Sequence, residues 1–309
     1  MNSLEQAILI TLAYFDVFDY PLTPMEVWRW LYVSQQQTDD RLRKAGLAEV
    51  VQQLEVLKTN GRLSEQWGFY ALPGRAELAV TRLDRYRLAE RKYHRAIQFI
   101  RVLRFAPFVR MIAVCNTLAY SNSRRTADID LFIVTSPGRI WQARFWVAGF
   151  LKFFKLRPTP GHTEDALCAS FFTDTNHLNL EPLALPQDIY LQYWVSQVVP
   201  VFDRGVYQDF LEANRWIRQR LPQVRPMSLP SRRRVVSVPW LHRLIEFVGG
   251  LIPESVFRRY QLRIMPPRLR SMANQDSRVV VQDSMLKFHD TDRRQQYLSE
   301  WRNRVAHIV

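Results

Sequence analysis

Two aspartates, Asp128 and Asp130, stand two residues apart at the start of the apolar run 129–135. In a β-strand, residues two apart leave the same face, so both carboxylates would converge on one point. Carboxylate oxygens are hard ligands, and such a pair can hold one or two Mg²⁺ (or Mn²⁺) ions against phosphate oxygens. The spacing therefore predicts a divalent-metal site at these two residues. The alternative is that both acids are solvated or cap a neighbouring element.

The segment before this pair has the composition of a phosphate-binding turn. An apolar run leads into Asn116 and Thr117, and a short helix is expected to follow. A turn that feeds a helix offers free backbone N–H groups to a phosphate, and Thr117 adds a hydroxyl. Ser123, Arg124 and Arg125 come next, where they could contact phosphates or form a solvated loop. We therefore predict nucleotide binding at Asn116, Thr117, Ser123, Arg124 and Arg125.

Residues 114–134, with the sequence VCNTLAYSNSRRTADIDLFIV, resemble the nucleotidyltransferase superfamily that includes DNA polymerase beta. The signature of that superfamily is a Gly-Ser turn followed, after a short helix and a loop, by Asp-x-Asp. The resemblance implies a polymerase-beta-like α/β domain with a small mixed sheet. It also implies an NTP as substrate, Mg²⁺ or Mn²⁺ as cofactor, and catalytic roles for Asp128 and Asp130.

Four further segments resemble an uncharacterised bacterial family with a winged-helix-like N-terminus, a nucleotidyltransferase core and a helical C-terminus. They are YFDVFDYPLT (14–23), PGRIWQARFW (137–146), EANRW (212–216) and FHDTDRR (288–294). Nearly the whole chain is then covered by the resemblance, which implies a fold and no particular acceptor substrate.

The chain departs from the superfamily pattern at two places. Asn116 and Thr117 stand where the superfamily has Gly-Ser; asparagine tolerates positive φ better than other non-glycine residues, so the turn can persist. The third carboxylate of the superfamily lies on the next core strand, but the run 166–171 contains none. We predict that Asp165, directly before this run, is the third catalytic acid, and the alternative is a plain loop carboxylate.

The periodicity of apolar residues predicts the elements that must position these groups. Helices are expected at 4–18, 23–31 and 45–58, and extended pieces at 62–64 and 68–72 complete a winged-helix-like module. A long helix at 77–103 precedes three strands at 109–115, 129–135 and 166–173, with an aromatic helix at 139–156. Further helices are expected at 189–199, 206–220, 254–265 and 292–305. The predicted fold class is α+β, with a winged-helix-like domain at 1–84, a nucleotidyltransferase-like domain at 85–200 and a helical C-terminal domain at 201–309.

Charge is unevenly distributed along the chain. Residues 1–84 hold 8 Lys and Arg against 11 Asp and Glu, whereas residues 201–309 hold 20 against 10, within a net charge of +14. The acidic N-terminal segment argues against DNA recognition by its third helix and favours a packing or protein-contact role. The basic remainder could attract a nucleotide, a nucleic acid or an anionic membrane surface.

The chain shows no sign of secretion or of a membrane span. Cys115 and Cys168 lie in apolar runs and indicate neither a disulfide framework nor a metal knuckle, and no secretory leader is evident, so we expect a cytoplasmic location. The apolar run 235–252 is interrupted by charged residues and is a poor spanning helix. The preceding run of three arginines at 232–234 leaves peripheral membrane contact open.

Three functions remain open at this point. The first is a Mg²⁺-dependent enzyme that transfers a nucleoside monophosphate from an NTP to a hydroxyl of RNA, protein or a small molecule. The second is a catalytically degenerate protein that keeps the fold and binds a nucleotide. The third is a regulator whose winged helix meets DNA or a partner protein. The sequence predicts no oligomeric state.

Overall fold

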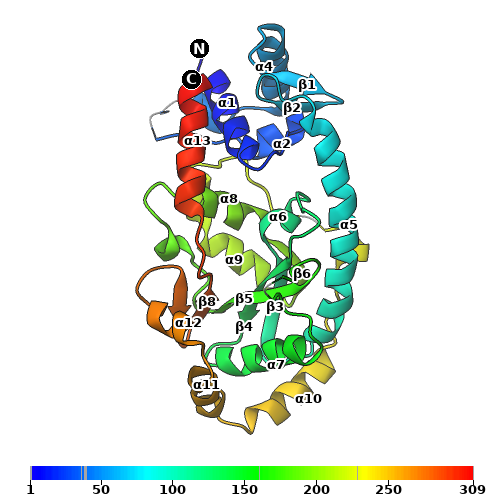
Figure 1. Ribbon diagram of the computed structural model, residues 1–309, viewed down its shortest axis with the longest axis vertical. Helices are drawn as coiled ribbons and strands as arrows, with labels where there is room; N and C mark the ends of the chain where they lie inside the picture. Colours follow the sequence, from blue (N-terminus) through cyan, green and yellow to red (C-terminus); the bar gives the residue numbers. More distant parts are fainter. Residues whose placement is uncertain (1, 36, 38–39, 160, 228, 309) are drawn as a thin grey trace.

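The N-terminal module consists of helices around an aromatic core and a small hairpin (Figure 1). Both α1 and α2 begin with a capping box, and the one at Thr23 with Glu26 confirms the predicted start of the second helix. The hairpin turns at Trp67 and Gly68, whose φ angles are both positive, as a two-residue turn between antiparallel strands requires. The computed structural model describes residues 2–35, 37, 40–159, 161–227 and 229–308. The elements of the module are α1 (Ser3–Asp16), α2 (Pro24–Arg29), α3 (Asp40–Arg43), α4 (Leu47–Thr59), β1 (Ser64–Gln66) and β2 (Phe69–Ala71).

A 26-residue helix, α5 (Leu78–Leu103), runs along one side of the molecule and joins this module to the sheet (Figure 1). Its inner side packs into the sheet core through apolar residues such as Tyr93 and Ile100. Lys92 lies on the same inner side, and its side chain is fully buried. The helix therefore carries a cation into the interior close to the sheet.

A six-stranded mixed sheet forms the centre of the molecule, in the order β6-β3-β4-β5-β8-β7. β4 and β5 are parallel, and all other neighbours are antiparallel. The three predicted strands are confirmed, whereas β6, β7 and β8 were not predicted. The strands are β3 (Val109–Val114), β4 (Ile129–Thr135), β5 (Leu167–Asp174), β6 (Val199–Asp203), β7 (Val279–Val281) and β8 (Met285–Phe288).

Helices cover both faces of the sheet. α5, α7 (Ile140–Phe153) and α11 (Glu254–Arg263) pack on the face that carries Leu131 and Ile133. α8 (Ile189–Gln197) and α9 (Tyr207–Ala213) cover the face that carries Phe132. Because side chains alternate along β4, Asp130 leaves the sheet on the face of α8 and α9. A single helical turn, α6 (Asn116–Ala119), lies between β3 and β4.

The segment 201–309 is shared between the sheet and the N-terminal module. β7 and β8 extend the sheet beside β5, while α13 (Arg294–Ile308) packs on α1 and places Trp301 against the aromatic core. The predicted helical C-terminal region is therefore helical only in part. Its two strands were not predicted, because strands of three and four residues are too short to show a clear periodicity. The remaining helices are α10 (Pro239–Gly250) and α12 (Pro267–Met272), with short 3₁₀ turns at Glu181–Leu183, Arg215–Gln219 and Ser231–Arg233.

The observed fold class is α+β with a small mixed sheet, in agreement with the prediction. Within the described residues, no helix combines the length and the apolarity that crossing a bilayer would require.

Candidate active site

Asp128 and Asp130 come together at the start of β4. One carboxylate oxygen of each and the Sγ of Cys168 all lie within 4.8 Å of one another. Cys168 joins the pair because β5 runs parallel to β4 in a register that sets Cys168 beside Asp130. The prediction that the two carboxylates share one face is therefore confirmed, and their spacing suits the coordination of one divalent cation.

The electrostatics of this acid pair favour a bound cation. Burial raises the pKa of Asp130, and the nearby charge of Asp128 raises it further, while hydrogen bonds from Asn116 and Cys168 act in the opposite direction. Burial also raises the pKa of Asp128. Among the described residues, neither acid forms an ion pair. Two close carboxylates without a cation resist ionisation, and a divalent metal would relieve both the repulsion and the burial cost.

Cys168 is a poor third ligand for a hard cation. Burial raises the pKa of its thiol to about 12, with a further contribution from the charge of Asp130. The sulfur therefore stays protonated near neutral pH, and a thiol is neither a hard ligand for Mg²⁺ nor a useful general base. The site is thus a two-carboxylate site with a neutral neighbour.

Asn116 connects the acid pair to the surrounding cleft. Its φ is +56°, so asparagine does adopt the left-handed conformation that the superfamily obtains with glycine. Its Oδ1 accepts hydrogen bonds from Trp194 Nε1 at 2.7 Å and from the Tyr190 hydroxyl at 3.2 Å. The amide group of the same side chain hydrogen-bonds Asp130. The α6 turn, which begins at Asn116, has only four residues, so its dipole is small and adds little to phosphate binding.

Asp165, the predicted third acid, does not belong to the group of ligand atoms that lie within 4.8 Å of one another at the acid pair. It adopts a positive φ of 58° before β5 begins, and its Oδ1 accepts a hydrogen bond from Lys92 Nζ at 2.8 Å. Lys92 also donates to the backbone carbonyls of Ala127 and Arg125. Asp165 therefore neutralises a buried lysine that ties the loop before β4 to the loop before β5. Cys168, and not a carboxylate, occupies the position on β5 next to the acid pair.

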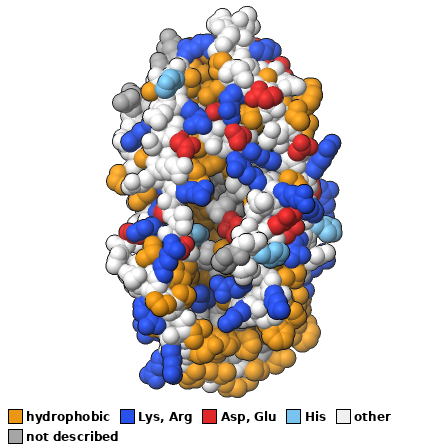
Figure 2. Space-filling view, viewed as in Figure 1, with side chains coloured by type: hydrophobic (Ala, Val, Ile, Leu, Met, Phe, Trp, Pro, Cys, Tyr) orange, Lys and Arg blue, Asp and Glu red, His pale blue; other side chains and the backbone are white. Residues whose placement is uncertain are grey.

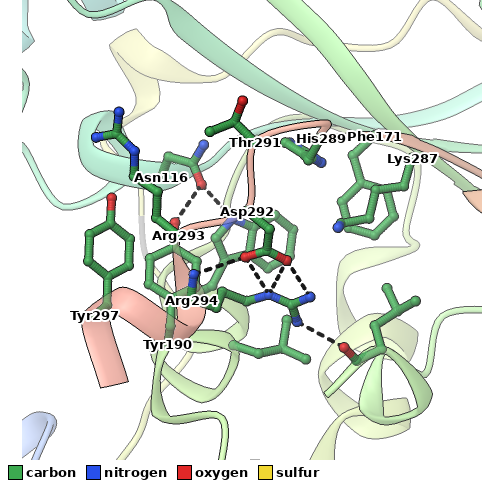
Figure 3. A pocket seen from close by; sticks show the side chains of 13 residues that line it. Asn116, Phe171, Tyr190, Lys287, His289, Thr291, Asp292, Arg293, Arg294 and Tyr297 are labelled. Carbon is green, nitrogen blue, oxygen red and sulfur yellow. Dashed lines mark hydrogen bonds and ion pairs between the residues drawn. The ribbon is translucent and has the colours of Figure 1, made fainter. Parts of the chain in front are cut away.

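Two adjoining cavities open beside Asn116, with volumes of about 220 Å³ and about 330 Å³. They share Asn116, Tyr190, Trp194, Arg293 and Tyr297, so they form one cleft between the sheet, α8 and the start of α13. Figure 3 shows the smaller of the two cavities. Neither Asp128 nor Asp130 lines either cavity, but Asn116 and Ala127, which lie next to them, do. The cleft is of the size range that small-molecule ligands occupy in proteins.

The predicted nucleotide-binding residues divide into two groups. Asn116, Thr117 and Arg124 line the larger cavity. Arg125 does not line it and pairs with Glu164 at 3.3 Å, while Ser123 is fully buried. Arg124 is also engaged, because it pairs with Asp19 of the N-terminal module at 3.4 Å. The basic loop thus contributes one arginine to the cleft.

Sequence reasoning missed most of the cleft wall, which comes from α8 and from the segment that leads into α13. The FHDTDRR motif supplies His289, Thr291, Asp292, Arg293 and Arg294 to the smaller cavity. The only signal in the sequence was the resemblance of this motif to the uncharacterised family, and that resemblance assigned it no role. Tyr190 and Tyr297 stack with ring centroids 5.4 Å apart at the border of the two cavities. This wall therefore combines aromatic surface with cationic groups.

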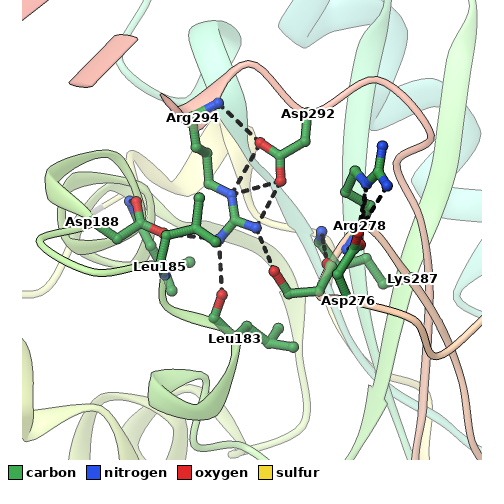
Figure 4. A network of polar contacts seen from close by, with 10 residues as sticks. Leu183, Leu185, Asp188, Asp276, Arg278, Lys287, Asp292 and Arg294 are labelled. Atoms are coloured by element: carbon green, nitrogen blue, oxygen red, sulfur yellow. Dashed lines mark hydrogen bonds and ion pairs between the residues drawn. The ribbon is translucent and has the colours of Figure 1, made fainter. Parts of the chain in front are cut away.

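Arg294 holds this wall in place through a buried network (Figure 4). Its Nη1 donates to Asp188 Oδ2 and to the Leu183 carbonyl, both at 2.8 Å, and its Nη2 donates to Asp292 Oδ2 at 2.6 Å. Asp188 in turn caps the first turn of α8. Arg293 next to it is exposed, lines both cavities and has no acidic partner among the described residues. Arg294 therefore stabilises the cleft wall, whereas Arg293 is available to bind an anion.

Two buried polar atoms in the cleft wall have no hydrogen-bond partner within the described structure: Nε2 of Gln197 and Nδ1 of His289. Burial, followed by the charge of Lys287, lowers the pKa of His289 to about 3, so its ring is neutral near pH 7. A buried donor or acceptor without a partner costs about 1–3 kcal/mol, which a polar ligand in the cleft would recover.

Comparison of the chain with protein-family models, with curated proteins and with solved structures gave no match. Its function is therefore inferred from the residues of the site and from the motifs quoted above.

Proposed function

We propose that this protein is a Mg²⁺-dependent nucleotidyltransferase that moves a nucleoside monophosphate from an NTP to a hydroxyl acceptor. The observation that carries the proposal is the convergence of Asp128 and Asp130 beside Asn116, with no ion pair to either acid among the described residues. The two carboxylates lie at the start of one strand, next to a turn with positive φ and a cleft with an unpaired arginine. This arrangement suits a metal–triphosphate complex.

The proposed fold family is polymerase-beta-like, with a winged-helix-like N-terminal module. Support comes from the order of the elements: β3, the Asn116 turn, α6, a loop and then Asp-x-Asp on β4. The N-terminal helices and the hairpin of β1 and β2 likewise follow the order of a winged helix. Tyr14 and Phe18 of this module line the larger cavity, which suits a role in closing the site and not in binding DNA.

Each part of the cleft has a role in this proposal. Bound Mg²⁺ would neutralise charge on the triphosphate and on the leaving pyrophosphate. Arg293 would pair with phosphate oxygens, and the Thr117 hydroxyl would donate to one of them. The stacked rings of Tyr190 and Tyr297 would offer a surface to the base or the acceptor, and Gln197 would supply a donor.

A second candidate, a nucleotide-binding protein without transfer activity, is favoured by one observation. Cys168, whose thiol stays protonated, takes the position on the neighbouring strand where the superfamily places its third acid. Without that acid, an acceptor hydroxyl lacks a nearby base. Nucleotide and metal would then bind at the same residues, and no transfer would follow.

Incubation with radiolabelled NTPs, Mg²⁺ and cell extract or RNA as acceptor tests the first candidate. We expect a labelled product with the wild type and a loss of at least about 1000-fold in Asp128→Asn/Asp130→Asn. The matched control is Asp84→Asn/Glu212→Gln, which removes the same charge from acids that are 63% and 60% exposed and do not line the cleft.

Three outcomes separate the candidates. Loss of product in the acid-pair variant alone supports the transferase. Equal transfer by both double variants contradicts it. An NTP-dependent and Mn²⁺-dependent rise in Tm that disappears in the acid-pair variant, with no labelled product from the wild type, identifies the binding protein.

A further inference from the structure

A continuous apolar face lies at the end of the molecule that is opposite the N-terminal module (Figure 1 and Figure 2). On α10 and directly after it, residues spaced by four, three and four positions point outward, so they form one stripe along the helix. The stripe continues onto α11. We define the apolar face by six residues with their exposed fractions: Trp240 (68%), Leu244 (53%), Phe247 (71%), Leu251 (71%), Val256 (52%) and Tyr260 (51%).

The side of α10 that faces the sheet domain carries polar and charged groups beside the half-buried Leu241 and Ile245. Its inward side carries the polar residues His242 and Glu246, and Glu246 pairs with Arg110 at 2.9 Å and with Arg204 at 2.5 Å. The ring of His242 packs near Phe105, with centroids 5.7 Å apart. Ion pairs therefore anchor the helix to the sheet domain while its large apolar side chains face solvent. Exposed apolar surface of this extent marks an interaction site.

The charges around the apolar face are mostly positive, and the exposed Asp283 beside α11 is paired with Arg258 at 2.8 Å. Only two acids occur in residues 236–264, and both turn inward: Glu246 as described, and Glu254, which accepts from the backbone N–H groups of Trp141 and Gln142. Arg243, Arg259 and Arg263 are exposed, and none of them has an acidic partner in the part of the chain that the structure describes. A partner that covers this face therefore meets apolar side chains ringed by arginine.

We propose that the apolar face of α10 and α11 docks on the surface of an anionic lipid bilayer. Its apolar side chains would enter the boundary between headgroups and acyl chains, and the three arginines would meet lipid phosphates. The amphipathic rings of Trp240 and Tyr260 suit that boundary. Self-association through a twofold axis is disfavoured, because it would set this mostly cationic rim, with its three unpaired arginines, against itself.

Flotation with lipid vesicles tests the proposal, using vesicles of phosphatidylcholine alone and vesicles in which one third of the lipid is phosphatidylglycerol. We expect the wild type to float with the anionic vesicles and at least tenfold less protein to float for Trp240→Ser/Phe247→Ser. Trp67→Ser is the matched control, because Trp67 is 63% exposed in the hairpin of β1 and β2, at the other end of the molecule. We expect this control to float like the wild type.

The arginines are tested separately. Arg243→Gln/Arg259→Gln/Arg263→Gln should bind anionic vesicles at least tenfold less and should lose the preference over phosphatidylcholine. Unchanged circular dichroism and Tm would show that each variant is folded, as expected for changes at exposed positions. The proposal is overturned if the wild type does not float with anionic vesicles or if Trp67→Ser loses binding as much as the α10 variant. A dimer in sedimentation that disappears in Trp240→Ser/Phe247→Ser would also overturn it, since a second copy would then cover the face.

Discussion

Asp130 and Asp165 stand near the first residues of two neighbouring parallel strands, yet their electrostatic surroundings are opposite. Burial tends to raise the pKa of both. At Asp165 the hydrogen bond and charge of Lys92, with the charges of Arg91 and Arg95, outweigh burial and lower the pKa. At Asp130 the nearest charge is another carboxylate, so the pKa is raised.

This difference distinguishes a structural acid from a candidate metal ligand. Asp165 already has its cation, supplied by a lysine whose side chain is fully buried. Within the described residues neither Asp128 nor Asp130 has an ion pair, and at Asp128 burial raises the pKa despite the opposing charge of Lys92; the two acids lie beside a cleft with an unpaired arginine. A half-buried pair of carboxylates without an ion-pair partner is costly to ionise unless a bound cation joins it, which is the basis of the metal-site proposal.

The largest effect on stability is expected from Asp165→Asn. The change leaves the buried charge of Lys92 without its acid, so we expect a loss of about 3 kcal/mol in the free energy of unfolding at pH 7. Metal binding at the acid pair should persist. Because the pKa of Asp165 is lowered by folding, its stabilising effect is lost as the pH falls through the folded value, and the gap to the wild type should close in acid. Denaturant unfolding at several pH values measures this, and a variant as stable as the wild type would contradict the assigned role.

A smaller change in stability, of opposite sign, is expected from Asp130→Asn in the absence of metal. Folding raises the pKa of Asp130, so the wild type loses stability as the pH rises from the ordinary carboxyl range toward the folded value. The variant lacks this loss and should be about 1–2 kcal/mol more stable at pH 8 in the presence of EDTA. Adding Mn²⁺ should stabilise the wild type and not the variant. Thermal unfolding with and without Mn²⁺ gives both results, and a variant that is less stable than the wild type in EDTA would refute the account.

The smallest effect is expected from Cys168→Ser. The Cys168 thiol stays protonated and is a soft ligand, so its loss should change the apparent affinity for Mg²⁺ by no more than about twofold. Binding of Zn²⁺, which can displace the thiol proton, should weaken by tenfold or more. Titrations of both metals followed by calorimetry test this contrast. A large loss of Mg²⁺ affinity would mean that the sulfur contributes to the site after all.

The sequence predicted the core of the fold well where periodicity is local. The run 129–135 corresponds to β4 residue for residue, and the long helix at 77–103 differs from α5 by one residue. β6 was missed because its first residue was assigned to the end of a helix at 189–199. β7 and β8 were missed because a strand of three or four residues is defined by its partner: β7 pairs with β8, and the pairing of β8 with β5 joins segments more than 100 residues apart.

The site was predicted to the extent that it depends on neighbours in sequence. The shared face of Asp128 and Asp130 follows from alternation along a strand, and the positive φ at Asn116 follows from the residue type. The structural role of Asp165 depends on its ion pair with Lys92, 73 residues earlier, and no local pattern reveals this contact. Arg293 and the stacked tyrosines reach the cleft only through tertiary packing, so their positions could not be read from the sequence.

The most direct test of the central claim is anomalous diffraction from crystals soaked with Mn²⁺ and a non-hydrolysable NTP. We predict an anomalous peak at about 2.1 Å from carboxylate oxygens of both Asp128 and Asp130, with the triphosphate in the cleft beside Asn116. A nucleotide bound elsewhere, or a nucleotide in the cleft with no peak at the acid pair, would contradict the claim that these two aspartates hold the metal of a nucleotidyltransferase.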